Sequence, residues 1–67
     1  MPESRREMAT RHVEAGRRIV YSQRQLIEQL RAGARPTVEA ERLLALYESS
    51  LQIFEEDLEA IIAKELK

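Results

Sequence analysis

Residues 32–37 read Ala-Gly-Ala-Arg-Pro-Thr, and they separate two long segments of helical apolar spacing. Gly33 supplies a residue that readily takes a positive φ just past a helix end. Pro36 has no backbone N–H and pushes Arg35 towards extended geometry, so a first helix cannot continue through it. Thr37 is a favoured N-cap residue for a second helix. The stretch therefore predicts a turn between two helices.

Both flanking segments carry apolar residues with helical periodicity. Ser4 and Glu7 have the spacing of a capping box, which marks the start of a helix. The predicted inward stripes alternate spacings of four and three: positions 12, 16, 19, 23, 26 and 30, flanked by Val13, Val20 and Ile27, and then positions 40, 44, 47, 51, 54, 58 and 61. We expect helices at about residues 5–31 and 38–65, joined by the turn at 32–37, in a single domain of residues 1–67.

A short connection forces the two helices to lie antiparallel. The predicted fold class is therefore all-α, an antiparallel two-helix hairpin. Folding about the turn places Gly16 opposite Phe54 and Gln23 opposite Tyr47. Gly16 is then expected to be a hole that receives the Phe54 ring. The Gln23 amide is expected to bond the Tyr47 hydroxyl or a partner chain, because a buried amide needs a hydrogen-bond partner.

The second segment carries more apolar residues than one partner helix can cover. A chain of 67 residues gains only roughly 3–5 kcal/mol from a single core, so such chains usually add disulfides, a metal or oligomerisation. Self-association is the remaining stabiliser here, as a homodimer of hairpins in a four-helix bundle with coiled-coil-like packing. The expected interface residues are Gly16, Ile19, Gln23, Leu26, Leu43, Leu44, Leu46, Tyr47, Leu51, Ile53, Phe54, Leu58 and Ile62.

The sequence lacks the residues of common catalytic and metal sites. With no cysteine and one histidine, it can form neither a thiolate nor a histidine-based metal site within one chain. It also has no glycine-rich phosphate loop and no serine plausibly paired with a base. His12 is expected to pack near the open end of the bundle, and the acidic residues at 55–59 are expected to be solvated. We predict no enzymatic activity, no cofactor and no metal site.

Charge is divided unevenly along the chain. Residues 1–34 carry seven arginines against four glutamates, whereas residues 35–67 carry four basic and eight acidic residues. A basic half is one feature of nucleic-acid binding, with Arg17, Arg18 and Arg24 as phosphate contacts. In a hairpin the acidic helix lies alongside, so we favour mutual neutralisation and expect no specific nucleic-acid partner. The lack of a long apolar run and of a signal peptide predicts a cytoplasmic protein with no membrane partner.

Residues 12–54 contain a series of helix-core and turn residues that forms a recognisable pattern. It reads His-Val, Gly-Arg-Arg-Ile, Gln, Leu-Ile and a glycine turn, followed by Ala-Glu-Arg-Leu-Leu; these begin at His12, Gly16, Gln23, Leu26, Gly33 and Ala40. This pattern resembles a group of short, uncharacterised proteobacterial helical-hairpin proteins. The resemblance implies a helical hairpin and brings no activity with it. It singles out His12, Gly16 and Gln23, which the stripes also place in the interface.

The predicted function is a non-enzymatic protein–protein interaction module that acts as a homodimeric helical bundle. The alternative is a small regulator that docks a helical signalling partner by forming a hetero-bundle, as the helical-hairpin phosphatases of response-regulator signalling do. That family carries a Ser-Gln-x-x-Asp motif, and Ser22-Gln23-Arg24-Gln25-Leu26 lacks its acid. A less favoured third hypothesis is weak nucleic-acid binding through the arginines of the first helix.

Overall fold

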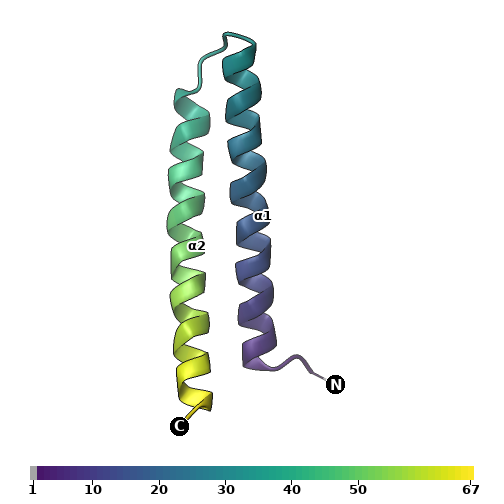
Figure 1. Ribbon diagram of the computed structural model, residues 1–67, viewed down its shortest axis with the longest axis vertical. Helices are drawn as coiled ribbons and strands as arrows, with labels where there is room; N and C mark the ends of the chain where they lie inside the picture. Colours follow the sequence, from purple (N-terminus) through teal and green to yellow (C-terminus); the bar gives the residue numbers. More distant parts are fainter. Residues whose placement is uncertain (1) are drawn as a thin grey trace.

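The computed structural model describes residues 2–67 and consists of two long helices (Figure 1). Helix α1 spans Arg5–Ala32 and helix α2 spans Val38–Glu65; they lie side by side and run in opposite directions. The molecule is 52 Å long and only 13 Å thick in its thinnest direction. Among the described residues there is no strand. The predicted all-α antiparallel hairpin is confirmed.

The start of α1 is fixed by the capping box that the sequence predicts. The Glu7 backbone N–H donates to the Ser4 hydroxyl at 3.1 Å, and the Ser4 N–H donates to the Glu7 carboxylate at 3.4 Å. Two of the N–H groups that a helix start leaves without partners are satisfied in this way.

At the end of α1, the residue with a positive φ lies one position later than predicted. Gly33 has a φ of −87°, and the left-handed position is taken by Ala34 at 56°. The Ala34 N–H donates to the Arg31 carbonyl at 3.0 Å and the Arg35 N–H donates to the Leu30 carbonyl at 2.8 Å. These are the two bonds of a Schellman motif with an alanine at the site that usually favours glycine. The expectation of a positive φ at Gly33 is therefore wrong.

Thr37 stands at the N-cap of α2, but its hydroxyl does not cap the helix. The hydroxyl donates to the Glu41 carboxylate at 3.3 Å, while the Thr37 carbonyl accepts the Glu41 N–H at 2.8 Å. Glu39 and Glu41 occupy the first turn of α2, where the helix dipole favours negative charge.

The inward side of α1 is rotated relative to the stripe predicted from the sequence. The buried residues are Ala9, Val13, Gly16, Val20, Gln23 and Ile27. Ile19 and Leu26, predicted to face α2 directly, are 48% and 42% exposed. Both stripes share Gly16 and Gln23, and each is apolar, so periodicity alone does not choose between them. The observed rotation places small and β-branched side chains against α2.

The column of α2 that faces α1 has the predicted phase. Ala40 is buried, and the following positions of the column are half-buried: Leu44, Tyr47, Leu51, Phe54, Leu58 and Ile61. Because α1 covers this column only in part, its large side chains keep a share of their surface in water.

Gly16 and Gln23 are the two buried positions where the sequence predicts a specific contact between the helices. A Cβ at Gly16 would lie 3.0 Å from the Leu51 Cδ1 and 3.7 Å from the Phe54 ring, so the predicted hole exists and Leu51 fills it more tightly than Phe54. Gln23 is buried, and its amide nitrogen donates to the Ala40 carbonyl at 2.9 Å. The predicted bond to the Tyr47 hydroxyl is wrong, because the amide reaches the α2 backbone instead.

Candidate interaction surface

Ion pairs join the two helices along one side of the hairpin. Arg17 pairs with Glu55 at 3.3 Å, and two further pairs, Arg24 with Glu48 and Arg31 with Glu41, are at 2.8 Å each. A fourth pair, Arg6 with Glu65 at 3.2 Å, lies at the open end. We call this side, defined by the residues of the first three pairs, the ion-pair face. More than half of each arginine side chain is exposed, so each pair contributes little to stability.

Each residue of the ion-pair face stands one position after an inward residue of its helix. Arg17 follows Gly16 and Arg24 follows Gln23 on α1, while Glu48 follows Tyr47 on α2. One residue turns a helix by about 100°, so following residues lie on one flank and preceding residues on the other. The ion pairs show that the residues following the inward positions of both helices lie on the same side, so the residues preceding the inward positions share the opposite side.

That opposite side is apolar, and we call it the apolar face. Its large side chains are 42–64% exposed and come from both helices: Met8, Ile19 and Leu26 on α1, and Leu43, Leu46 and Ile53 on α2. Small or polar residues lie between them at the same helical spacing: His12, Ala15 and Ser22 on α1, and Ser50, Asp57 and Ala60 on α2. The hairpin therefore has one charged side and one side with the composition of a helix-packing seam.

A shallow hollow of about 370 Å³ lies in the middle of the apolar face. It is lined by Ile19, Leu26 and Tyr47, with Arg18, Ser22 and Gln23 around them. The amide nitrogen of Gln23 is already bonded to the Ala40 carbonyl, so the floor of the hollow is mostly apolar. The hollow has the character of a hole for a large apolar side chain from another helix.

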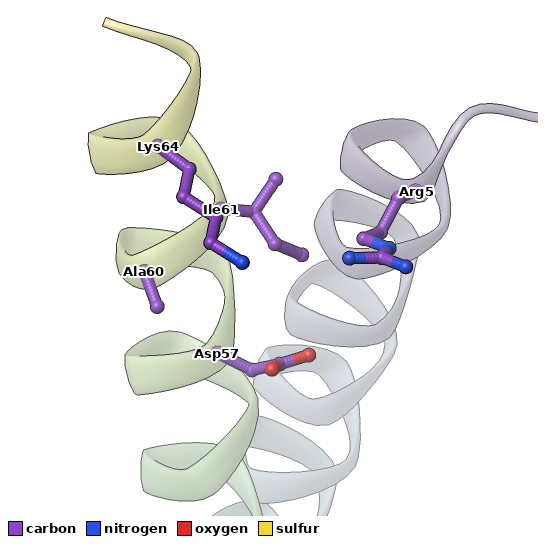
Figure 2. A pocket seen from close by; sticks show the side chains of 5 residues that line it. All are labelled: Arg5, Asp57, Ala60, Ile61 and Lys64. Carbon is purple, nitrogen blue, oxygen red and sulfur yellow. The ribbon is translucent and has the colours of Figure 1, made fainter. Parts of the chain in front are cut away.

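A second hollow, of about 360 Å³, lies at the open end of the hairpin (Figure 2). Ile61 and Asp57 extend from α2 towards α1, and the Arg5 guanidinium faces them from α1. Ala60 and Lys64 complete the lining. Within residues 2–67 none of these three charged side chains has an ion-pair partner within 4.0 Å. Unpaired charges of both signs therefore border the apolar face at this end.

The predicted interface residues lie in four places. Gly16 and Gln23 are buried between the helices, and Ile62 is half-buried beside the ion-pair face. Five residues lie half-buried in the inward column of α2: Leu44, Tyr47, Leu51, Phe54 and Leu58. The remaining five lie together on the apolar face: Ile19, Leu26, Leu43, Leu46 and Ile53.

Sequence reasoning missed Met8 and the small residues of the apolar face. Met8 is 44% exposed and continues the row of Ile19 and Leu26 towards the open end. The sequence pattern of the apolar face is a second set of positions, each of which lies one residue before an inward residue. A scan for large apolar side chains alone does not detect this set, because small or polar residues fill half of it.

Residues 2–67 contain no group of three or more metal-ligating side chains. His12 is exposed, and its ring centroid lies 5.3 Å from that of Phe54 at a tilt of 38°. The histidine therefore packs against an aromatic ring at the edge of the apolar face.

No helix between residues 2 and 67 is long and apolar enough to cross a membrane. Comparison of the chain with protein-family models, with curated proteins and with solved structures gave no match. What the chain does is therefore inferred from the chemistry of its own surface.

Proposed function

We propose that the chain is a non-enzymatic association module that works as a homodimer, in which two hairpins form a four-helix bundle. The observation that carries this proposal is the apolar face, where large apolar side chains of both helices gather on one exposed side. Contiguous exposed apolar patches on soluble proteins mark interaction sites. Helix pairs with such a face commonly bury it against a second pair.

The total surface of the hairpin supports the same proposal. Its solvent-accessible area is 5549 Å². A compact folded monomer of 7.8 kDa exposes about 4,400 Å². The excess, about 1,200 Å² for each chain, is in the range that each partner buries in an obligate dimer. Self-association would thus bring the exposed area per chain to the value expected for its mass.

The core between the two helices is thin for a chain of this length. The buried apolar residues of the described chain are Ala9, Val13, Val20, Ile27 and Ala40, and none of them is larger than isoleucine. The larger side chains of α2, such as Leu51 and Phe54, remain half-buried. A second hairpin on the apolar face would add the apolar burial that this small core lacks.

A matched pair of substitutions tests the proposal. Ile53, on the apolar face, is 64% exposed, and Tyr21, between Arg17 and Arg24 on the ion-pair side, is 65% exposed. The unsubstituted chain is expected to sediment as a dimer at tens of micromolar. Ile53→Glu should give a monomer, because a dimer would bury two carboxylates at a cost of several kcal/mol each. Tyr21→Glu should leave the dimer intact.

The outcomes separate the proposal from its alternatives. A folded 7.8 kDa monomer for the unsubstituted chain would overturn self-association. Dissociation by Tyr21→Glu but not by Ile53→Glu would show that the dimer uses the ion-pair side.

The alternative function is a regulator that docks a helical signalling partner and forms a hetero-bundle with it. It uses the same apolar face, whose central hollow accepts a large apolar side chain from any amphipathic helix. A chain that is monomeric and folded on its own, yet loses partner binding with Ile53→Glu, would favour this alternative.

A further inference from the structure

We infer that the second copy lies on the apolar face in a reversed orientation, with the turn of each hairpin over the open end of the other. This inference rests on the proposed self-association. It concerns how the two copies are arranged, so the dimer can exist even if this arrangement is wrong.

The inference starts from the order of residues along the apolar flank of α2. Glu39 stands at the turn end and Lys64 at the open end, about 37 Å apart on one helix. Between them lie Leu43, Leu46, Ser50, Ile53, Asp57 and Ala60. The flank thus begins with an acid, ends with a base, and is mostly apolar or small in between. A sequence of this kind complements itself when it is reversed.

Both terminal charges of this flank are available. The side chain of Glu39 is 87% exposed, and its one ion-pair partner among the described residues is Arg42 of the same helix, at 3.7 Å. Lys64 borders the open-end hollow and has no ion pair within residues 2–67.

In the reversed arrangement, α2 packs antiparallel to α2 of the second copy. Glu39 of each copy then lies beside Lys64 of the other, which gives two ion pairs for each dimer. The same register sets Leu43 opposite Ala60, Ile53 opposite Ser50 and Leu46 opposite Asp57. The first two pairs combine a large with a small side chain, the combination that lets facing helices interdigitate, and the third places the Asp57 carboxylate beside Leu46.

The aligned arrangement, with both turns at the same end, places α1 of each copy over α2 of the other. Arg5, Asp57 and Lys64 border the same hollow in one hairpin, so this arrangement brings four cations and two carboxylates together at one end, with a net positive charge. At the other end, neither Glu39 lies beside Lys64 of the second copy. Repulsion between like charges disfavours the aligned dimer.

Cross-linking between single-cysteine chains tests the orientation, and the natural chain has no cysteine to interfere. A Glu39→Cys chain is mixed with a size-tagged Lys64→Cys chain and treated with a short bis-maleimide. The reversed arrangement predicts a covalent heterodimer on a denaturing gel. The aligned arrangement predicts cross-linking of Arg5→Cys with Lys64→Cys instead. Glu59→Cys, which follows an inward residue on α2, is the control and should not cross-link to Lys64→Cys.

Each result has a defined meaning. Cross-linking of Glu39→Cys with Lys64→Cys supports the reversed dimer. Cross-linking of Arg5→Cys with Lys64→Cys overturns it, as does the absence of both products when sedimentation shows a dimer. A monomer in sedimentation overturns the proposed function itself, so the two failures are distinguishable.

Charge reversal gives a second, independent test. The Glu39→Lys chain alone and the Lys64→Glu chain alone should each dimerise more weakly, by roughly two- to tenfold for two exposed pairs. Mixed together, they should form a heterodimer in preference to either homodimer, because the reversed arrangement then restores both ion pairs. Equal affinity of the homodimers and the heterodimer would overturn the inference.

Discussion

At the scale of single residues, Gly16 shows how closely the helices approach. Glycine inside a helix is unfavourable by about 1 kcal/mol relative to alanine, so its presence needs a packing reason. The 3.0 Å distance from a Cβ at Gly16 to the Leu51 methyl group supplies that reason. The neighbouring Ala9 and Val13 are also small, so the middle and the open half of α1 are shaped for close contact with α2.

Gly16→Leu should therefore destabilise the protein by about 1–3 kcal/mol, the usual range for overpacking. Gly16→Ala should have a much smaller effect, because the gain in helix propensity offsets the strain and the atom it meets is the flexible end of Leu51. Urea unfolding at fixed protein concentration measures both. Glu14→Leu, at an exposed position two residues away, is the control for added apolar bulk. An increase in stability with Gly16→Leu would show that position 16 has room to spare.

At the scale of elements, the ends of the helices and their rotation were predictable to different degrees. Pro36 and the capping residues act locally, so the sequence is sufficient to place the break between α1 and α2. The rotation of α1 about its own axis is determined by its packing against α2. The stripe with Ile19 and Leu26 and the stripe with Val20 and Ile27 are equally apolar, and the choice depends on which one packs against α2. The same ambiguity concealed the α1 part of the apolar face, which consists of the stripe that does not pack against α2.

The end of α1 also allows a prediction, because the left-handed residue is Ala34 and not Gly33. Ala34→Gly should stabilise the hairpin by up to about 1 kcal/mol, since glycine takes a positive φ without the steric penalty of a Cβ. Gly33→Ala should be tolerated, because its φ is ordinary and its Cβ would meet atoms no closer than 3.6 Å. Thermal unfolding of the two single variants at equal concentration provides the measurement. Destabilisation by Ala34→Gly would contradict the Schellman geometry.

At the scale of the whole molecule, two helices with a thin core and an excess of exposed surface would gain stability from the proposed association. A ligand that binds only the folded state raises the apparent stability of the protein. In the proposed dimer, the second copy acts as such a ligand. The proposed dimer therefore implies a melting temperature that rises with protein concentration. The ion-pair face, in contrast, needs no second copy, because its charges are satisfied within one hairpin.

That internal neutralisation also bears on nucleic-acid binding. Of the seven arginines in residues 1–34, five are in ion pairs: Arg6, Arg11, Arg17, Arg24 and Arg31. Non-specific binding depends on cations that displace counterions from phosphates, and it falls steeply with salt. We expect no sub-micromolar, sequence-dependent shift of DNA or RNA mobility at about 0.15 M ionic strength.

A variant that removes the acids of the ion-pair face tests whether ion pairing with α2 weakens nucleic-acid binding. Replacing Glu41, Glu48 and Glu55 with glutamine frees three arginines for phosphate contacts. This variant should bind nucleic acid more tightly than the unsubstituted chain at low salt, with a steeper salt dependence, because each additional phosphate contact adds about one unit to the slope. If the unsubstituted chain bound a specific sequence at physiological salt, the arginines would have a role that their pairing with α2 does not suppress. Binding by both proteins only at low salt would be the ordinary attraction of exposed cations to a polyanion.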